Sequence, residues 1–224
     1  SFGITIESKF TENFIERLPF TLTDGQRNAL DRVFDSLQSN QPSRVLIQGD
    51  VGCGKTIVAV IACLNVVRNG YQCLVLVPTE VLCNQHFKTF TSLFSDIGKV
   101  VMLSGKDSSP KKGDIKLELK NGKISILVAT HALLYDDYDF KNLALVVIDE
   151  QHKFGVKQRE KITSSYPYQP HLIYMSATPI PRTLALVLYE NMNYIKIPDK
   201  PSSQKRTKSA VYSDHKRQKV YELV

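Results

Sequence analysis

A glycine-rich run between two apolar segments carries the clearest chemistry in the chain. It reads GDVGCGKT and fits the pattern G-x-x-x-x-G-K-[ST]. Glycines at these spacings let successive backbone N–H groups converge on a phosphate, and a helix that begins beside them adds the positive end of its dipole. The run therefore predicts a nucleotide-binding loop made of Gly49, Asp50, Val51, Gly52, Cys53, Gly54, Lys55 and Thr56.

Side chains of this loop and two acids farther along the chain supply what ATP hydrolysis needs. Lys55 would reach the β- and γ-phosphates, and Thr56 would offer a hydroxyl to Mg²⁺. Asp149 follows the apolar run LVVI, at the strand end where α/β sheets place ligands, and would hold the metal partly through water. Glu150 would orient and deprotonate the attacking water. A strand ending in two acids can also be a solvated turn, but the phosphate loop favours the catalytic interpretation.

Short runs rich in Val, Ile and Leu alternate with helical patterns and must hold these residues in place. Continuous apolar strands separated by helices predict an α/β domain with a parallel sheet covered on both faces. The helix after the phosphate loop, over 56–68, is apolar nearly all round, so we expect it to be buried. The predicted strands are 44–48, 73–77, 124–128, 145–148 and 172–175.

Three stretches differ from this alternation. Residues 1–18 show a short amphipathic pattern, which predicts a packing arm or the remnant of an upstream domain. Residues 104–113 are expected to form a turn-rich loop, and the basic tail 199–224 a linker toward a following domain. Each of these two stretches is more often a solvated surface than a binding site. The main domain is therefore placed at 19–198.

The composition points to an acidic partner and against a membrane protein. The chain has 224 residues with a net charge of +7, and Lys and Arg gain free energy by displacing counterions from phosphates. None of its apolar runs approaches the roughly 18 residues needed to cross a bilayer. The chain begins with Ser1 and shows no signal peptide, so we expect an excised or processed piece of a cytoplasmic protein.

The cysteines do not form a metal-binding pattern in the sequence. They recur at ten-residue intervals but include no CxxC pair and no spacing typical of zinc sites. Incidental thiols of a reduced protein are the simpler interpretation. These residues are Cys53, Cys63, Cys73 and Cys83.

A histidine completes the tetrapeptide that begins at Asp149. The tetrapeptide reads DEQH, ends at His152, and resembles the DEAH form of motif II in superfamily 2 helicases. A lone histidine is usually structural, so the tetrapeptide carries the inference. In that superfamily the histidine would couple the γ-phosphate to a neighbouring segment.

Other helicase motifs follow in the expected order once this resemblance is accepted. The run LTDGQ resembles the Q motif, in which Gln26 would recognise the adenine edge and favour ATP over GTP. Its Thr23 could instead be a plain helix cap. Turns resembling motifs Ia and Ib would contact DNA phosphates, and one resembling motif III would link nucleotide state to DNA grip, although each could be an ordinary strand-to-helix turn. Their residues are Thr79 and Glu80 (Ia), Thr130 and His131 (Ib), and Ser176, Ala177 and Thr178 (III).

Longer strings resemble the RecG family of bacterial DNA helicases. They read GDVGCGKT, PTE, THAL, DEQHKFGV and ATPIPRTLA, and span most of the chain. The related Mfd family shares the glycine loop and ATPIPRTL but usually carries PTT and DEEH-like forms. Glu80 and Gln151 therefore favour RecG, while Cys53 and Lys153 stand where Ser and Arg are common.

The resemblance implies a RecA-like P-loop NTPase lobe that uses ATP and Mg²⁺ to move on branched or forked DNA, as a monomer, in recombination and repair. It also implies a wedge domain and a second RecA-like lobe with an arginine finger elsewhere in the protein, so we expect weak hydrolysis by this lobe alone. An Mfd-like lobe is the alternative within the superfamily. A nucleotide-switched binding domain with little hydrolysis is an alternative of another class, and Glu150 argues against it.

Overall fold

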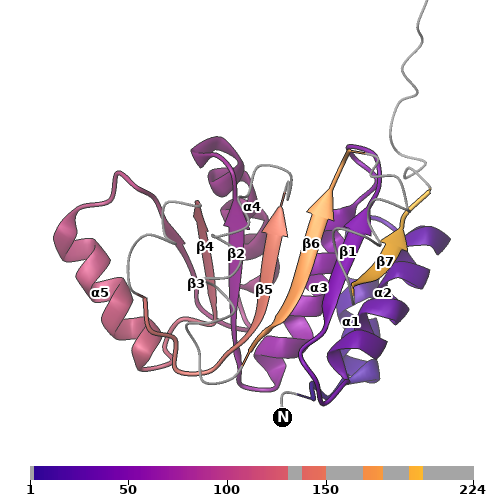
Figure 1. Ribbon diagram of the computed structural model, residues 1–224, viewed down its shortest axis with the longest axis horizontal. Coiled ribbons are helices and arrows are strands. Elements are labelled where there is room, and N and C mark those ends of the chain that lie inside the picture. Colours follow the sequence, from indigo (N-terminus) through magenta and orange to yellow (C-terminus); the bar gives the residue numbers. More distant parts are fainter. Residues whose placement is uncertain (1–2, 131–137, 150–168, 179–191, 199–224) are drawn as a thin grey trace, which may run out of the picture.

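The computed structural model describes residues 3–130, 138–149, 169–178 and 192–198 (Figure 1). Its centre is a seven-stranded sheet in the order β3-β4-β2-β5-β6-β1-β7, and all pairs of neighbouring strands are parallel. The predicted α/β fold with a parallel sheet is therefore confirmed. The strands are β1 Arg44–Gln48, β2 Gln72–Val77, β3 Val100–Leu103, β4 Ile126–Thr130, β5 Leu143–Asp149, β6 His171–Ser176 and β7 Asn193–Lys196.

The inner strands coincide with the apolar runs of the sequence, and the two outermost strands were not predicted. Strands β2, β4 and β6 are buried along their whole length. The edge strands β3 and β7 are short and partly exposed, so their residues need not form a fully apolar run. Strand β4 begins at Ile126, two residues later than the pattern suggested.

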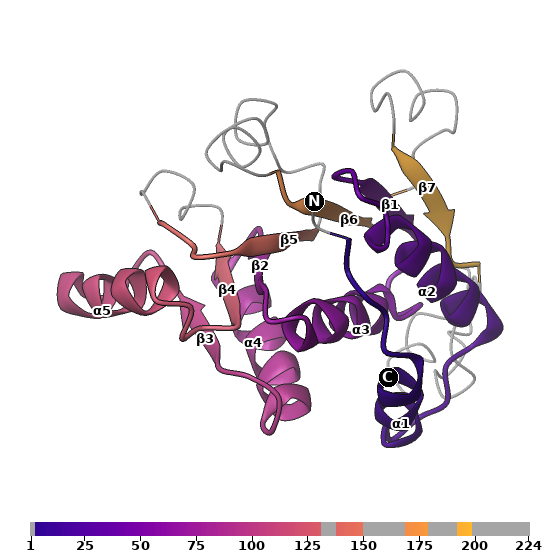
Figure 2. The same cartoon turned by 90° about the horizontal axis from the view of Figure 1, so that it is seen from below.

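The described helices lie on both faces of the sheet (Figure 2). Buried residues of the first four helices share one core with alternate residues of the strands, while Ile115 and Leu119 of the fifth share the core on the other face. The helices are α1 Ser8–Glu16, α2 Asp24–Leu37, α3 Lys55–Arg68, α4 Glu80–Phe94 and α5 Ser109–Lys120. As expected, α3 is buried over nearly its whole length, including the polar Asn65.

The prediction of a loop over 104–113 was wrong in its second half. Helix α5 already begins at Ser109, with Pro110 in its first turn. Proline is compatible with a first turn because that position needs no N–H partner within the helix. The turn-rich composition therefore marked the start of a helix as well as a loop.

Residues 3–18 pack on the lobe. Ile4 and Ile15 are buried in the core shared with α3, and the backbone N–H of Ile4 donates to the carbonyl of Leu37 (3.0 Å). The buried Asn65 Oδ1 accepts a hydrogen bond from Thr11 Oγ1 at 3.1 Å. Helix α1 is thus tied to α3 by a polar contact as well as by apolar burial.

Candidate functional site

The predicted site residues that the structure describes gather at the carboxyl edge of the sheet, the upper edge in Figure 1. Strand register places Gln48, which leads into the phosphate loop, opposite Ser176, and places Asp149 opposite Met175. Thr130 lies opposite Val77, directly before the Pro78–Glu80 turn. The strand order therefore puts the phosphate loop after β1 and Asp149 on β5, with the predicted motif III turn at the end of β6 between them. The predicted DNA-contact turns lie at the ends of β2 and β4.

The phosphate loop has the backbone that its glycines allow. Gly52 and Gly54 have φ angles of 83° and 86°, in the left-handed region that favours glycine. Gly54 is also the N-cap of α3, where no side chain caps the helix. The first N–H groups of α3 are thus left uncapped by side chains, as an anion site at a helix start requires.

The loop is closely fitted to its surroundings. A Cβ at Gly49 would approach the carbonyl oxygen of Ile197 to 2.9 Å and would crowd Cys53 Sγ. A Cβ at Gly54 would collide with the side-chain amide of Gln26. Cys53 itself is buried under the loop, whereas Asp50, Val51 and Gly52 are exposed.

The ammonium group of Lys55 lies against the loop that it follows. Its Nζ donates to the carbonyl oxygens of Gly49 (2.6 Å) and Asp50 (3.1 Å), and the residue is only 9% exposed. A buried ammonium needs partners, which these carbonyls supply. The following Thr56 is half-buried in the first turn of α3.

Gln26 connects helix α2 to the phosphate loop. Its Oε1 accepts from the backbone N–H of Thr23 (2.9 Å), and Thr23 Oγ1 accepts from the backbone N–H of Gln26 (3.2 Å). This reciprocal pair is a capping box, so Thr23 is a helix cap as the simpler interpretation held. Gln26 Nε2 also donates to the carbonyl of Cys53 at 2.8 Å, which brings the residue to the nucleotide loop.

Asp149 has a close partner that the sequence did not indicate. His86 Nε2 lies 2.9 Å from Asp149 Oδ2, and the side chains are 6% and 13% exposed. A few carboxylate and hydroxyl oxygens suit Mg²⁺, which keeps much of its shell as water and phosphate oxygen. Asp149 and Thr56 fit that requirement. The described part of the chain contains no cluster of three or more His, Cys, Asp or Glu side chains that could hold a metal ion.

The turn after β6 is held to the phosphate loop by hydrogen bonds. Ser176 Oγ lies 2.9 Å from Thr178 Oγ1, and the carbonyl of Ser176 accepts from the backbone N–H of Gly49 (3.2 Å). Gln48 Nε2 donates to the carbonyl of Thr178 at 2.7 Å. Ala177, between them, is half-buried. The predicted motif III turn is therefore hydrogen-bonded directly to the start of the nucleotide loop.

The Thr79–Glu80 turn caps helix α4. Thr79 Oγ1 accepts from the N–H of Leu82 (3.3 Å), which leaves its hydroxyl hydrogen available to another acceptor. Hydrogen bonds from Lys106, at 2.7 Å, and then from Ser104 lower the pKa of the Glu80 carboxyl below its ordinary value. Glu80 thus links the turn to the loop that follows β3.

Three predicted site residues lie outside the described residues: Glu150, His131 and His152. The basic stretch 199–224 also lies outside them. The cysteines Cys53, Cys63, Cys73 and Cys83 are free thiols and buried. Burial and then the nearby Glu80 carboxylate raise the pKa of Cys83 to about 11.

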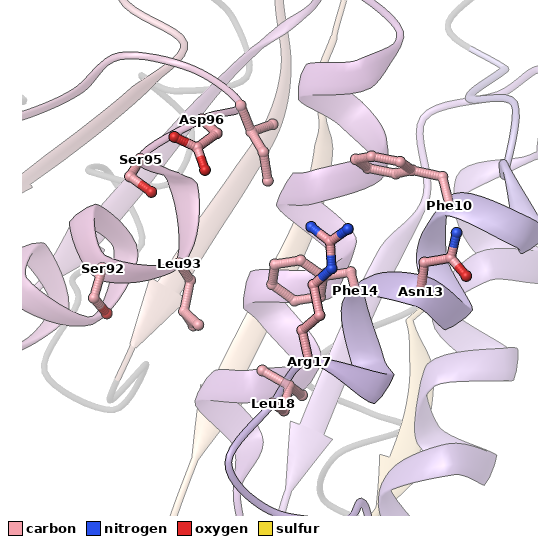
Figure 3. Close-up of a pocket in the computed structure, with 10 residues that line it drawn as sticks. Phe10, Asn13, Phe14, Arg17, Leu18, Ser92, Leu93, Ser95 and Asp96 are labelled. Carbon is pink, nitrogen blue, oxygen red and sulfur yellow. The ribbon is translucent and has the colours of Figure 1, made fainter.

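A groove of about 370 Å³ lies elsewhere, between α1 and the end of α4 (Figure 3). Phe10, Phe14 and Arg17 form one wall, and Leu93 and Asp96 belong to the other. Since α4 runs from the carboxyl edge of the sheet toward the opposite edge, its last residues lie far from the phosphate loop. The groove is therefore separate from the nucleotide site.

Among the described residues, no helix is both long and apolar enough to span a bilayer.

Comparison with known proteins gives one consistent family. Residues 23–187 match the description "DEAD/DEAH box helicase". The chain is 42% identical over 223 residues to the ATP-dependent DNA helicase RecG of Aquifex aeolicus, covering 99% of this chain and 28% of that protein. It is 41% identical over 220 residues to RecG of Thermotoga maritima, covering 98% of this chain and 28% of that protein. The chain thus spans somewhat over a quarter of the length of these curated relatives.

Solved structures agree with this comparison. A structure described as RecG bound to a three-way DNA junction matches with a TM-score of 0.87 and 36% identity, covering all of this chain and 30% of that one. The helicase MrfA, at 18% identity and a TM-score of 0.66, covers 89% of this chain and 34% of its own, and shares the fold.

Proposed function

This chain belongs to the DEAD/DEAH box helicase family as a homologue of the ATP-dependent DNA helicase RecG, and from that premise we propose that it is the ATP-binding and hydrolysing motor lobe of a RecG-like translocase that remodels branched DNA. Stalled replication forks and Holliday junctions are the proposed substrates, in recombination and repair. The observation that carries the proposal is the common edge of β1, β6 and β5, where the phosphate loop lies beside Ser176 and Asp149 ends the next strand.

Lys55 changes partners in this proposal. In place of the carbonyls of Gly49 and Asp50, its ammonium binds the β- and γ-phosphate oxygens of ATP. A hydrogen bond from an ammonium to a charged phosphate oxygen is stronger than one to a neutral carbonyl. The exposed residues Asp50, Val51 and Gly52 offer their backbone N–H groups to the same phosphates.

Asp149 and the hydroxyl of Thr56 would hold Mg²⁺, which when bound neutralises charge on the β- and γ-phosphates. Glu150 directly follows Asp149 and is the proposed acceptor of a proton from the attacking water. His152 and the Ser176–Thr178 turn are proposed to pass the state of the γ-phosphate to the rest of the motor. Gln26 is proposed to recognise adenine.

The turns on β2 and β4 are the proposed DNA contacts. Thr79 and Thr130 would donate hydroxyl hydrogens to phosphate oxygens, together with His131. Contacts of this kind hold the DNA without reading its sequence. The Glu80 carboxylate repels phosphate, so its proposed part is to hold Lys106 beside the turn.

The relatives are more than three times as long as the part that this chain matches. We infer that a wedge domain and a second RecA-like lobe complete the enzyme, the second lobe adding an arginine that stabilises the transferring phosphoryl group. Such a finger is worth roughly a thousandfold or more in rate, so hydrolysis by this lobe alone is expected to be slow. The identity to RecG proteins favours this proposal over an Mfd-like lobe.

The test is the Mg-ATPase rate of this chain with and without forked DNA, beside Lys55→Ala and Glu150→Gln. Retained ATP binding that Lys55→Ala abolishes, with little hydrolysis, would support half of a two-lobed motor. A strong DNA-stimulated rate lost in both variants would show that no second lobe is needed. ATP binding that survives in Lys55→Ala would contradict the proposed site.

A further inference from the structure

Helix α4 connects the side of the sheet edge with the predicted DNA contacts to the side with the proposed metal ligand. It begins at the Thr79–Glu80 turn after β2, on the side of the predicted DNA contacts. About two turns later it presents His86, whose ring reaches Asp149 on the neighbouring strand β5. Residues that are 63 positions apart in the sequence thus meet at the proposed metal site.

The contact between His86 and Asp149 has a defined direction. Nε2 lies 2.9 Å from Oδ2. An ionised carboxylate can only accept a hydrogen bond, so Nε2 carries the hydrogen and is the donor. His86 is 5% exposed, and the surrounding protein therefore limits the positions its ring can take. One oxygen of Asp149 is held in place by a side chain that can itself move little.

The surroundings of His86 make the carboxylate its main polar partner. Its other nitrogen, Nδ1, is buried and has no hydrogen-bond partner among the described residues. The neighbouring residues of α4 that face the core, Cys83 and Phe90, belong to the apolar cluster. Burying an imidazole among apolar side chains costs free energy because the ring loses its hydration, and the hydrogen bond to Asp149 offsets part of that cost.

We propose that His86 is a positioning residue for the metal-binding carboxylate of Asp149. It would hold one oxygen in place so that the carboxylate meets Mg²⁺ in a fixed orientation. It would also place that carboxylate in contact with the helix whose first turn is the proposed DNA contact. This inference rests on the proposed function, because it takes Asp149 as a Mg²⁺ ligand.

Residues that orient a metal ligand change metal affinity by about 10- to 100-fold when removed. The matched variants are His86→Met and His86→Gln, which have similar length and volume but differ in a hydrogen-bond donor. Binding of a fluorescent ATP analogue to this chain is measured in EDTA and then during titration with Mg²⁺. In His86→Met the Mg²⁺ concentration for half of the effect is expected to rise about tenfold or more, with affinity in EDTA unchanged. His86→Gln should restore a value close to that of the unaltered protein.

Two further variants separate positioning from loss of a buried histidine. His171→Met removes a fully buried histidine at the opposite end of β6, so it should lower the melting temperature without moving the Mg²⁺ midpoint. In Asp149→Asn, the added His86→Met change should have no further effect on that midpoint. A folded His86→Met protein with an unchanged midpoint would show that His86 only packs.

The bond can also be followed without any substitution at His86. The side-chain Nε2–H resonance of His86 should shift when Mg²⁺ is added to the nucleotide complex, and should not shift in Asp149→Asn. If the chemical shift of this resonance does not change with Mg²⁺ in the unaltered protein, the inference is overturned even if His86→Met does not fold. Absence of any nucleotide binding by the unaltered chain would instead overturn the proposed function.

Discussion

At the scale of single residues, the nucleotide loop depends on contacts that glycine alone permits. Gly54 combines a left-handed backbone with a close approach to Gln26, and Gly49 lies against the carbonyl of Ile197. Lys55 finds its partners inside the same loop. Loop shape and side-chain placement are therefore set together, and a change at either glycine should disturb both.

Gly54→Ala should destabilise the lobe and weaken nucleotide binding. The alanine would adopt a left-handed backbone at a cost of about 1 kcal/mol, and its Cβ would displace the amide of Gln26 from the carbonyl of Cys53, at about 1 to 2 kcal/mol more. Gly70→Ala is the control, because Gly70 has a φ of 78° with nothing near its missing Cβ. Urea unfolding should show the larger loss for Gly54→Ala, and equal losses would argue against the contact with Gln26.

Gln26→Ala is expected to lower the preference for ATP over GTP. It removes the bond to Cys53 and half of the capping box, with a loss of stability of about 1 to 3 kcal/mol. Thr23→Ala removes the cap but leaves the bond to the loop, so it should lower stability while keeping the preference. Competition of ATP and GTP against a fluorescent analogue measures the preference. If both variants lose it equally, Gln26 acts as a helix cap and does not recognise the base.

At the scale of elements, α3 is the centre of the lobe. It begins at the phosphate loop, it is buried between the sheet and helices α1 and α2, and it carries a polar side chain in its interior. Asn65 Nδ2 donates to the carbonyl of Ile61. Its Oδ1 accepts from the hydroxyl of Thr11 and from the backbone N–H of Glu7. Helix α1 is therefore expected to unfold together with the nucleotide site.

Asn65→Ala should cost about 1 to 3 kcal/mol, because the backbone N–H of Glu7 loses its Asn65 acceptor and the Thr11 hydroxyl keeps only the carbonyl of Glu7. Asn84→Ala is the matched control. Asn84 makes the same type of bond, to the carbonyl of Glu80 four residues earlier, but on the exposed face of α4. Its loss should lie within about 0.5 kcal/mol. Chemical denaturation measures both, and equal losses would mean that α1 is not held through Asn65.

At the scale of the whole molecule, the charge of +7 matters where it lies beside the proposed DNA turns. Lys106 is 81% exposed on its side chain and bound to Glu80 of the α4 turn. Lys9 is also exposed, but on α1, a helix that packs on α3. Substituting either lysine by glutamine changes the net charge by the same amount, so the pair distinguishes a local contact from a general charge effect.

DNA binding by this chain should weaken as salt rises. Each phosphate that a Lys or Arg side chain neutralises contributes about −0.9 to the slope of log affinity against log salt, so three such contacts would give about −2.7, or roughly a 40-fold loss between 50 and 200 mM. Lys106→Gln should lower the slope by about one, and Lys9→Gln should leave it unchanged. Fluorescence anisotropy with forked DNA measures these slopes. Identical slopes for the two variants would show that binding follows net charge alone.

The local sequence determined the parts of this protein that depend on neighbouring residues. The glycines and Lys55 of the phosphate loop lie within eight consecutive residues, and their backbone preferences and a buried helix start suffice to predict the loop. The inner strands were recognisable because burial on both faces demands continuous apolar runs. The order of the motifs along the chain was enough to indicate the helicase family.

Tertiary structure decided which distant residues meet. The pairs His86 with Asp149 and Gln26 with Cys53 could not be read from spacing, because they depend on strand order and on the way each helix crosses the sheet. The edge strands β3 and β7 became strands through pairing with β4 and β1, although their own burial is partial. A strand at the sheet edge forms its hydrogen bonds with one neighbour only, and the local sequence pattern does not indicate which strand that neighbour is.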